Sequence, residues 1–361
     1  MRRREFMTML VGAAGTAWPV IGLAQQQPKL STIGFLGPTA PAPGWVAAVL
    51  GRLRELGWTQ GGNLSIEYRW AEGRPERIPE FAAEFVRLKV DVIVTAGTPV
   101  VLAVRRATTA IPIVFSSAGD PVGTGLVASL AHPGGNVTGL SFMTAEVAGK
   151  RIELLREVVP NLRRLAVIVN AGFPDAMLEM GEVKAVTKTL GLEVSSHEVR
   201  RPDDIPTAIE TMKNQADALY VCGDPLMVGN RVRLNALALA ARLPTVHSLG
   251  EHVEAGGLIS YGVDNADLFK DAAAYADRIL RGKQPADLPV QAPAKFTLVV
   301  NLKGAKALGL TVSTSTLLRA NEVIERRCCL LQCMSLVVAL SGHPGTSAFW
   351  SLSGGKRTSP G

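Results

Sequence analysis

The chain has 361 residues, 47% of them hydrophobic and 19% charged, which is enough to bury a large core in two globular units. Its 36 Gly and 22 Pro, with only 5% aromatic residues, favour an α/β protein with many short strand-to-helix turns over a sandwich of aromatic-rich strands. The net charge of +7 lies mostly at the ends, because residues 1–24 carry +2 and residues 326–361 carry +4, so nucleic acid is not expected as a partner of the nearly neutral body.

Residues 1–24 read as an export signal. Arg3-Arg4-Glu5-Phe6 precedes an uncharged apolar stretch, residues 7–23, and a small-residue end at Ala24. This pattern is typical of a secretory signal, and the paired arginines resemble a twin-arginine signal. We therefore expect a periplasmic protein cleaved near Ala24. A retained membrane anchor is the alternative, and it also places the body outside the cytoplasm.

From Leu30 onwards, short apolar runs alternate with amphipathic ones, which predicts βαβ units and a parallel sheet. In the first half we expect strands at Thr32–Gly37, Asn63–Trp70, Asp91–Thr95 and Ile111–Ser116, and helices at Trp45–Leu56, Ile78–Leu88 and Pro99–Ala107. The regularity lapses over the Gly- and Pro-rich residues 116–139, which we interpret as a crossing between two units.

A second α/β series follows this crossing. Its expected helices are Glu146–Val158, Met177–Leu190, Ile205–Asn214 and Val228–Ala241, and its expected strands are Leu165–Asn170, Glu193–Val199, Ala218–Cys222, Pro244–Val246 and Gly257–Tyr261. With further crossings near Ser248 and residues 285–293, lobe 1 is expected to comprise residues 29–118 and about 248–285, and lobe 2 residues 119–247 and about 286–325. Facing strand ends of two such lobes define a ligand cleft.

Residues 114–139, VFSSAGDPVGTGLVASLAHPGGNVTG, resemble the ABC transporter substrate-binding family related to tryptophan- and tyrosine-binding proteins. Leu56-Gly57-Trp58, Thr95-Ala96-Gly97-Thr98-Pro99 and the run from Phe296 to Lys303 support the resemblance, which spans roughly residues 29–325. It implies the type I periplasmic binding protein fold, two Rossmann-like lobes joined by a multi-strand hinge. It also implies solute capture by hinge closure for the membrane permease of an ABC importer, without catalysis. Known relatives hold aromatic or other amino acids, so an amino acid or similar carboxylate is the expected solute.

In the first lobe, the turn Thr95-Ala96-Gly97-Thr98 ends a strand and opens a helix, so its N–H groups and hydroxyls can hold the carboxylate of a solute. Thr98 can equally be an ordinary helix cap. Ser116 and Ser117 end the neighbouring strand, and Pro38 and Thr39 follow the first strand, so all four are further candidates.

Two other residues of the first half have an alternative role each. Asp120, before Pro121, can contact the solute or bond its own turn and set the hinge. Trp45 can stack on a solute or pack under its helix.

Across the cleft, Asn170 ends a strand and Phe173 follows three positions later. Asp224 follows another strand and is the leading candidate to pair with an ammonium group, although it can also cap the next helix. Tyr261 is a further candidate after a later strand, and the lone His247 fits a structural role better than a ligand contact.

The catalytic and nucleotide motifs that we sought are missing: a GxSxG elbow, an HExxH pair, a GxxxxGK[ST] loop, and a GxGxxG turn after the first strand. Cys222 is alone in the body, and no CxxC pair has a partner His, so no metal or cofactor is expected. An exported enzyme and a ligand-sensing receptor remain the alternative functions. A monomer or weak dimer is expected.

Residues 326–361 depart from the family pattern. They contain Cys328, Cys329 and Cys333, an apolar run that ends at Leu340, and a basic end rich in Gly, Ser and Pro. We interpret this segment as a disordered or non-native extension and assign it no function.

Overall fold

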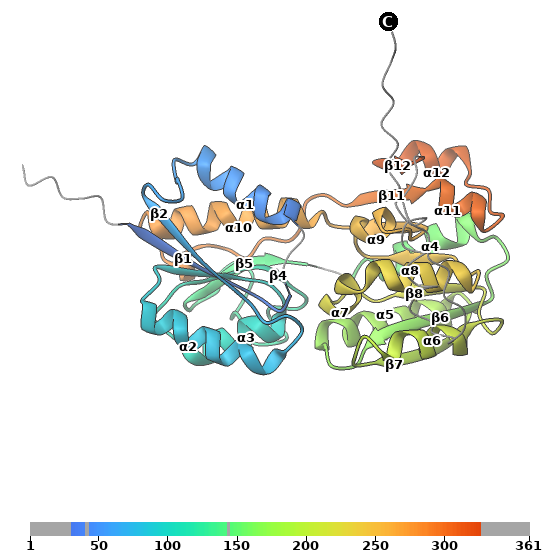
Figure 1. Ribbon diagram of the computed structural model, residues 1–361, viewed down its shortest axis with the longest axis horizontal. Helices are drawn as coiled ribbons and strands as arrows, with labels where there is room; N and C mark the ends of the chain where they lie inside the picture. The colour runs from blue at the N-terminus through green and yellow to red at the C-terminus, as the bar shows by residue number, and fades with distance from the viewer. Residues whose placement is uncertain (1–29, 40–42, 143–144, 326–361) are drawn as a thin grey trace, which may run out of the picture.

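The computed structural model describes residues 30–39, 43–142 and 145–325, so the expected export signal and the C-terminal extension lie outside the described residues. The described chain forms two α/β lobes that lie side by side (Figure 1). No helix within these ranges is both long and apolar enough to cross a membrane.

The first lobe is built on a parallel five-stranded sheet in the order β2-β1-β3-β4-β5. Its strands are β1 (Ser31–Gly37), β2 (Leu64–Trp70), β3 (Val92–Thr95), β4 (Ile113–Ala118) and β5 (Val137–Ser141). Helices α1 (Pro43–Glu55) and α10 (Asn265–Leu280) pack on one face, and α2 (Ile78–Leu88) and α3 (Thr98–Ala107) pack on the other (Figure 1). β3 is buried along its whole length, as the apolar run predicts for a central strand covered on both faces.

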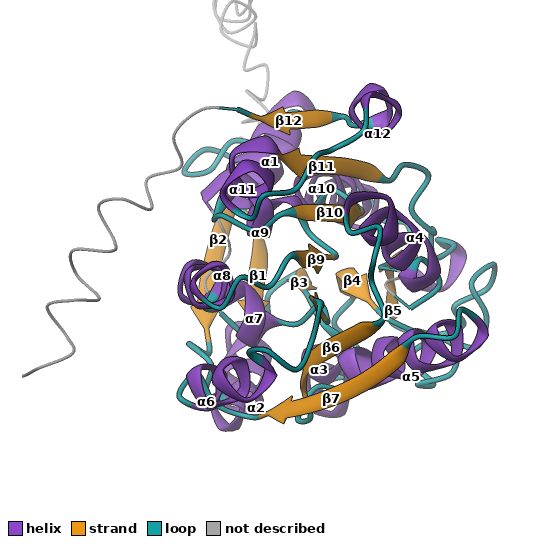
Figure 2. Ribbon diagram, turned by 90° about the vertical axis from the view of Figure 1, so that its right-hand side faces the viewer, coloured by secondary structure: helices purple, strands orange, loops and turns teal. Residues whose placement is uncertain are grey.

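The second lobe has a seven-stranded sheet in the order β12-β11-β10-β9-β8-β6-β7, which runs from top to bottom of Figure 2. Its strands are β6 (Arg164–Asn170), β7 (Glu193–Val199), β8 (Ala218–Val221), β9 (Thr245–His247), β10 (Ile259–Gly262), β11 (Thr297–Asn301) and β12 (Glu322–Ile324). All neighbouring strands are parallel except β10 and β11, which are antiparallel.

Helices on both faces cover the second sheet. They are α4 (Ala148–Val158), α5 (Pro174–Thr189), α6 (Asp204–Met212), α7 (Pro225–Gly229), α8 (Arg231–Ala240), α9 (Gly250–Glu254), α11 (Leu302–Ala307) and α12 (Thr314–Arg319). α4 and α5 pack into one core with β6, whereas α6 and α8 pack into the core on the opposite side. The single helix expected at Val228–Ala241 is divided into α7 and α8 at Asn230, whose φ of −109° and ψ of 14° are not helical.

Both lobes repeat one strand order. In chain order, β1 to β5 lie in the sheet as second-first-third-fourth-fifth, and β6 to β10 do the same. In such sheets the ligand site lies beyond the carboxyl ends of the strands where the order reverses, here between β1 and β3 and between β6 and β8. The topology therefore places a site at one end of each sheet.

The lobe boundaries differ from those expected. The expected boundary after Ala118 lies too early, because the chain returns after its Gly- and Pro-rich loop and adds β5 beside β4, with Ile113 opposite Val137. Gly139 permits this close pairing, since a Cβ there would lie 2.0 Å from the carbonyl oxygen of Phe115. The first crossing to lobe 2 therefore follows β5.

The second and third crossings are also displaced. β10 pairs with β9 and β11 in the second sheet, so the chain leaves lobe 2 between Gly262 and Asn265 and not near Ser248. It stays in lobe 1 through Gln291, which bridges to Leu140 of β5 before the chain returns to form β11.

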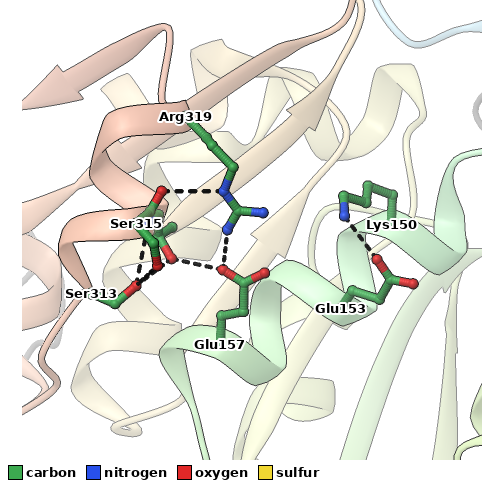
Figure 3. Close-up of polar contacts among 7 residues, drawn as sticks. Lys150, Glu153, Glu157, Ser313, Ser315 and Arg319 are labelled. Carbon is green, nitrogen blue, oxygen red and sulfur yellow. Dashed lines mark hydrogen bonds and ion pairs between the residues drawn. The ribbon is translucent and has the colours of Figure 1, made fainter.

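The last described helix, α12, is attached to α4 through one carboxylate. Thr316 Oγ1 donates to Glu157 Oε2 at 2.7 Å, and the Arg319 guanidinium donates to the same oxygen (Figure 3). Lys150 and Glu153 pair with each other on α4 at 2.9 Å. Glu157 therefore joins the C-terminal end of the described chain to the first helix of lobe 2.

Candidate functional site

A cleft lies between the two lobes at the carboxyl ends of their strands. It encloses about 790 Å³ of space free of protein atoms, part of which is open to solvent. Its lining combines a group of aromatic side chains with two aspartates, one at the start of α5 and one at the start of α7.

Four aromatic side chains of lobe 1 form one wall of the cleft. Phe269 stacks on Trp45 with ring centroids 5.2 Å apart and on Phe35 at 5.9 Å, and Trp70 meets Phe35 edge-on at 5.4 Å. Phe142 and Phe173 add further aromatic surface to the lining. This wall can cover the flat or aliphatic body of a solute, and aromatic faces also attract cations.

Asp224 lies in the second lobe directly after β8 and caps α7. Its Oδ1 accepts hydrogen bonds from Leu226 N at 2.6 Å, from Met227 N at 3.2 Å and from Asn170 Nδ2 at 3.2 Å. Burial raises the pKa of this carboxyl from 3.8 to about 6, and the three hydrogen bonds partly offset that effect. Oδ2 is buried and has no hydrogen-bond partner among the described residues.

Asp175, near the start of α5, reaches across to lobe 1. Its Oδ2 accepts from Thr98 Oγ1 at 2.8 Å and from the backbone N–H of Gly119 at 3.3 Å. Burial raises its pKa, and the hydrogen bonds from Thr98 and Gly119 lower it in part. Its Oδ1 is buried without a hydrogen-bond partner in the described part of the chain.

A second hydrogen bond joins the lobes through α9. Trp45 Nε1 of α1 donates to Glu251 Oε1 at 2.7 Å, and burial is the main cause of the raised pKa of Glu251. Trp45 thus contacts the aromatic wall and the opposite lobe at once, and stacking on a solute stays a prediction. The lobes are in direct contact through Trp45 and through Asp175.

A buried polar network lies under Asp224. Glu179 Oε1 accepts from Arg151 at 2.6 Å and from the Tyr220 hydroxyl at 2.7 Å, and its Oε2 accepts from Gly223 N at 2.8 Å. Glu179 stands four residues after Asp175 on α5, and Arg151 Nε also donates to the Tyr261 carbonyl at 2.6 Å. The network therefore ties α5, the loop that carries Asp224 and the end of β10 to one another.

Several of the residues singled out from the sequence line the cleft: Pro38, Thr39, Trp45, Gly97, Ser117, Phe173 and Asp224. Thr95, Thr98 and Ser116 lie buried outside its lining, where Ser116 Oγ donates to the Thr95 carbonyl at 3.3 Å. Asn170 also lies outside the lining, but it holds Asp224 through its side-chain amide.

Three other candidates occupy structural positions. Asp120 is exposed and its Oδ1 accepts from Gly123 N at 2.8 Å, so it bonds its own turn outside the cleft lining. Tyr261 stacks on Phe296 with centroids 5.7 Å apart, also outside that lining. His247 is fully buried and stacks on His252 at 4.5 Å, and burial holds its pKa well below the usual value, which keeps it neutral.

Sequence reasoning missed Asp175 and most of the aromatic wall. Asp175 stands inside a helix and not at a strand end, so the search for polar residues after strands did not select it. Asn265 and Phe269 belong to α10, a helix that was not among the elements expected from the sequence. Trp70 closes β2, and its position at a strand end was an available signal.

Within residues 30–325, leaving out the two short gaps, no cluster of three or more His, Cys, Asp or Glu side chains is arranged to hold a metal ion. The site is instead an apolar cleft with two buried carboxylates.

Comparisons with known proteins match the chain to solute-binding proteins. A family model described as ABC transporter substrate binding protein matches residues 45–324. Over 259 residues the chain is 29% identical to a tyrosine-binding protein of Clostridioides difficile (strain R20291), an alignment that covers 72% of this chain and 74% of that protein.

Two solved structures allow the arrangement of the lobes to be compared. The ABC domain from Streptococcus pneumonia in complex with L-Trp has 27% identity and a TM-score of 0.76, covering 81% of this chain and 99% of that one. A ligand-free, open substrate-binding protein with adhesive properties from Clostridium difficile has 25% identity and a TM-score of 0.62. That match covers 82% of this chain and 100% of the other. The chain therefore superposes better on the L-Trp complex than on the ligand-free, open structure.

Proposed function

The chain belongs to the family of ABC transporter substrate-binding proteins, and on that premise we propose that it is the extracytoplasmic component of an importer. Its fold is that of type I periplasmic binding proteins. In this proposal the cleft holds a small solute that has an amino group and an apolar body. Amino acids are the first candidates, because relatives include a tyrosine-binding protein and an L-Trp complex.

The observation that carries this proposal is the buried, unpartnered Oδ2 of Asp224 in an otherwise aromatic cleft. A charged carboxylate in such a place is stabilised by a cationic hydrogen-bond donor, and an ammonium group is the simplest one. The apolar body of the solute then packs on the wall of Phe35, Trp45, Trp70 and Phe269. A solute that contacts both lobes favours the closed arrangement, which the permease recognises.

Export by residues 1–24 and release of the solute without chemical change are parts of the same proposal. A monomer or weak dimer stays a prediction. An exported enzyme predicts turnover of the bound molecule, whereas a sensing receptor predicts binding without import. Recovery of the solute unchanged after binding, together with lost uptake in a strain that lacks the protein, supports the importer.

The test of the amine site is Asp224→Asn, measured by isothermal titration calorimetry against a panel of amino acids and amines. Asn keeps an oxygen that can cap α7, so the variant removes the charge while retaining the local hydrogen bonds. We expect the free energy of binding to weaken by about 1–3 kcal/mol. Asp120→Asn is the matched control, because Asp120 is exposed and outside the cleft lining, and it should leave the affinity unchanged. Equal affinities for the wild type and Asp224→Asn would place the amine elsewhere.

A further inference from the structure

The anion position at the start of α3 is filled by the protein itself. We expected the turn at Thr95–Thr98 to hold the carboxylate of a solute, yet Asp175 Oδ2 accepts from Thr98 Oγ1 at 2.8 Å and from Gly119 N at 3.3 Å. Gly119 permits this approach, since a Cβ there would lie 2.7 Å from Asp175 Cγ. In this structure, a carboxylate from lobe 2 therefore occupies donors that a solute carboxylate would need.

The cleft lining has two negative charges and, among its described residues, no Lys, Arg or His. Asp175 is 6% exposed and Asp224 is 4% exposed, and each has one carboxylate oxygen without a hydrogen-bond partner within the described ranges. The uncharged polar side chains of the lining are those of Thr39, Ser117 and Asn265. Residues 40–42 and 143–144, which adjoin lining residues in sequence, read APA and MT and contain no base either.

We propose that the solute is a cation, a primary amine joined to an aromatic or aliphatic body, without a free carboxylate. This inference rests on the proposed function, because it concerns the solute of the same cleft. It replaces the amino acid as the expected solute with an amine that has no carboxylate. An amine adds one positive charge to a cleft that is lined by two carboxylates. A zwitterionic amino acid adds a third carboxylate beside them, and such juxtaposition of like charges is unfavourable.

The raised pKa values of the two aspartates favour a cationic solute over an anionic one. Burial raises the pKa of both carboxyls, that of Asp224 to about 6. Hydrogen bonds lower both pKa values in part, but no basic side chain is among the groups that lower them. A positive charge in the cleft would favour the charged forms of these carboxyls. The faces of Trp45 and Trp70 supply additional attraction for a cation.

The test compares wild-type protein with matched pairs of molecules that differ only in the carboxylate: tryptamine and L-tryptophan, phenethylamine and L-phenylalanine, and isoamylamine and L-leucine. Calorimetry should show that the amine of the best-bound pair binds at least about tenfold more tightly than its amino acid. The amide of that amino acid keeps the size of the carboxylate group but removes its charge. We expect the amide to bind like the amine. Binding as weak as that of the amino acid would contradict the charge argument.

Asp175→Asn supplies the second arm. Asn retains an oxygen for Thr98 but removes one negative charge, so the preference for amine over acid should narrow. Asp203→Asn, at an exposed carboxylate outside the lining, should leave the preference unchanged. Thermal unfolding verifies that each variant is folded. If Asp175→Asn is not folded, the matched pairs of ligands measured on the wild-type protein decide the question by themselves.

The outcomes separate this inference from the proposed function. Tighter binding of the amine, with a smaller preference in Asp175→Asn, supports the inference. Equal or tighter binding of the amino acid by the wild type overturns it, while the amine site at Asp224 stands as long as Asp224→Asn still weakens binding. Failure of every pair to bind overturns both.

Discussion

At the scale of single residues, the site depends on carboxylates held in an unfavourable environment. Raising the pKa of Asp224 from 3.8 to about 6 corresponds to about 3 kcal/mol of destabilisation of its charged form. Three hydrogen bonds to its Oδ1 fix the carboxyl in place without supplying a cation. In the proposed complex, a bound ammonium group recovers part of that free energy.

This environment makes the affinity depend on pH. Because the pKa of Asp224 is raised to about 6 in the solute-free protein, a growing fraction of this carboxyl is protonated as the pH falls through that value. The ammonium group binds the charged form, so affinity should be highest at neutral pH and fall about tenfold between about pH 7.5 and pH 5. Asp175, whose pKa burial also raises, acts in the same direction. Calorimetry at several pH values measures this, and Asp224→Asn should flatten most of the dependence; a wild-type affinity independent of pH would contradict it.

The buried pair of Arg151 and Glu179 makes a prediction about stability. Their side chains are 1% and 0% exposed, and Glu179→Gln removes the buried carboxylate that pairs with the guanidinium. We expect the free energy of unfolding of the second lobe to fall by about 3–5 kcal/mol in urea denaturation. Glu153→Gln, at an exposed pair on α4, is the control and should change stability by less than about 0.5 kcal/mol. A similar, small effect of both substitutions would mean that the network does not stabilise the lobe.

At the scale of elements, the alternation of apolar and amphipathic runs predicted the α/β class and most strands, because covered parallel strands are short and continuously apolar. β5 was missed, since Val137–Ser141 contains Gly139 and follows a loop that reads as a linker. Positions after strand ends gave Pro38, Thr39, Gly97, Ser117 and Asp224 as lining residues. Asp175 depends on how the two lobes face each other, which no local pattern encodes.

The attachment of α12 to α4 can be tested at this scale. Glu157→Ala removes the acceptor shared by Thr316 and Arg319 (Figure 3). The side chains of Glu157 and Arg319 are 34% and 45% exposed. Such a partly exposed pair is worth up to about 1 kcal/mol. We expect faster hydrogen exchange in α12 with a small change in global stability. Glu153→Ala alters the same helix without touching this contact, and equal exchange in both variants would show that Glu157 does not hold α12.

At the scale of the whole molecule, two lobes with the same strand order face each other across the cleft and touch through carboxylates of lobe 2. Asp175 accepts from Thr98, and Glu251 accepts from Trp45. Each contact spans the opening, so each favours the closed arrangement at the cost of burying a carboxylate. The solute and these contacts therefore act on the same equilibrium.

Removing one of these contacts should shift the solute-free protein towards an open arrangement. Thr98→Val keeps the size of the side chain but removes the hydroxyl that donates to Asp175. We expect a larger radius of gyration in small-angle X-ray scattering, reversed by saturating solute. Thr189→Val removes a hydroxyl that bonds within α5 and should leave the radius unchanged. An unchanged radius for Thr98→Val would show that this hydrogen bond does not hold the lobes together.

The central claim is that the cleft binds the amino group of a small solute at Asp224, and a crystal structure of the complex tests it most directly. The best-bound molecule of the calorimetric panel is the one to crystallise. We expect its nitrogen within about 2.7–3.2 Å of Asp224 Oδ2, with its apolar body against Trp45 and Trp70. A solute bound outside the cleft, or inside it with no polar contact to Asp224, would contradict the account.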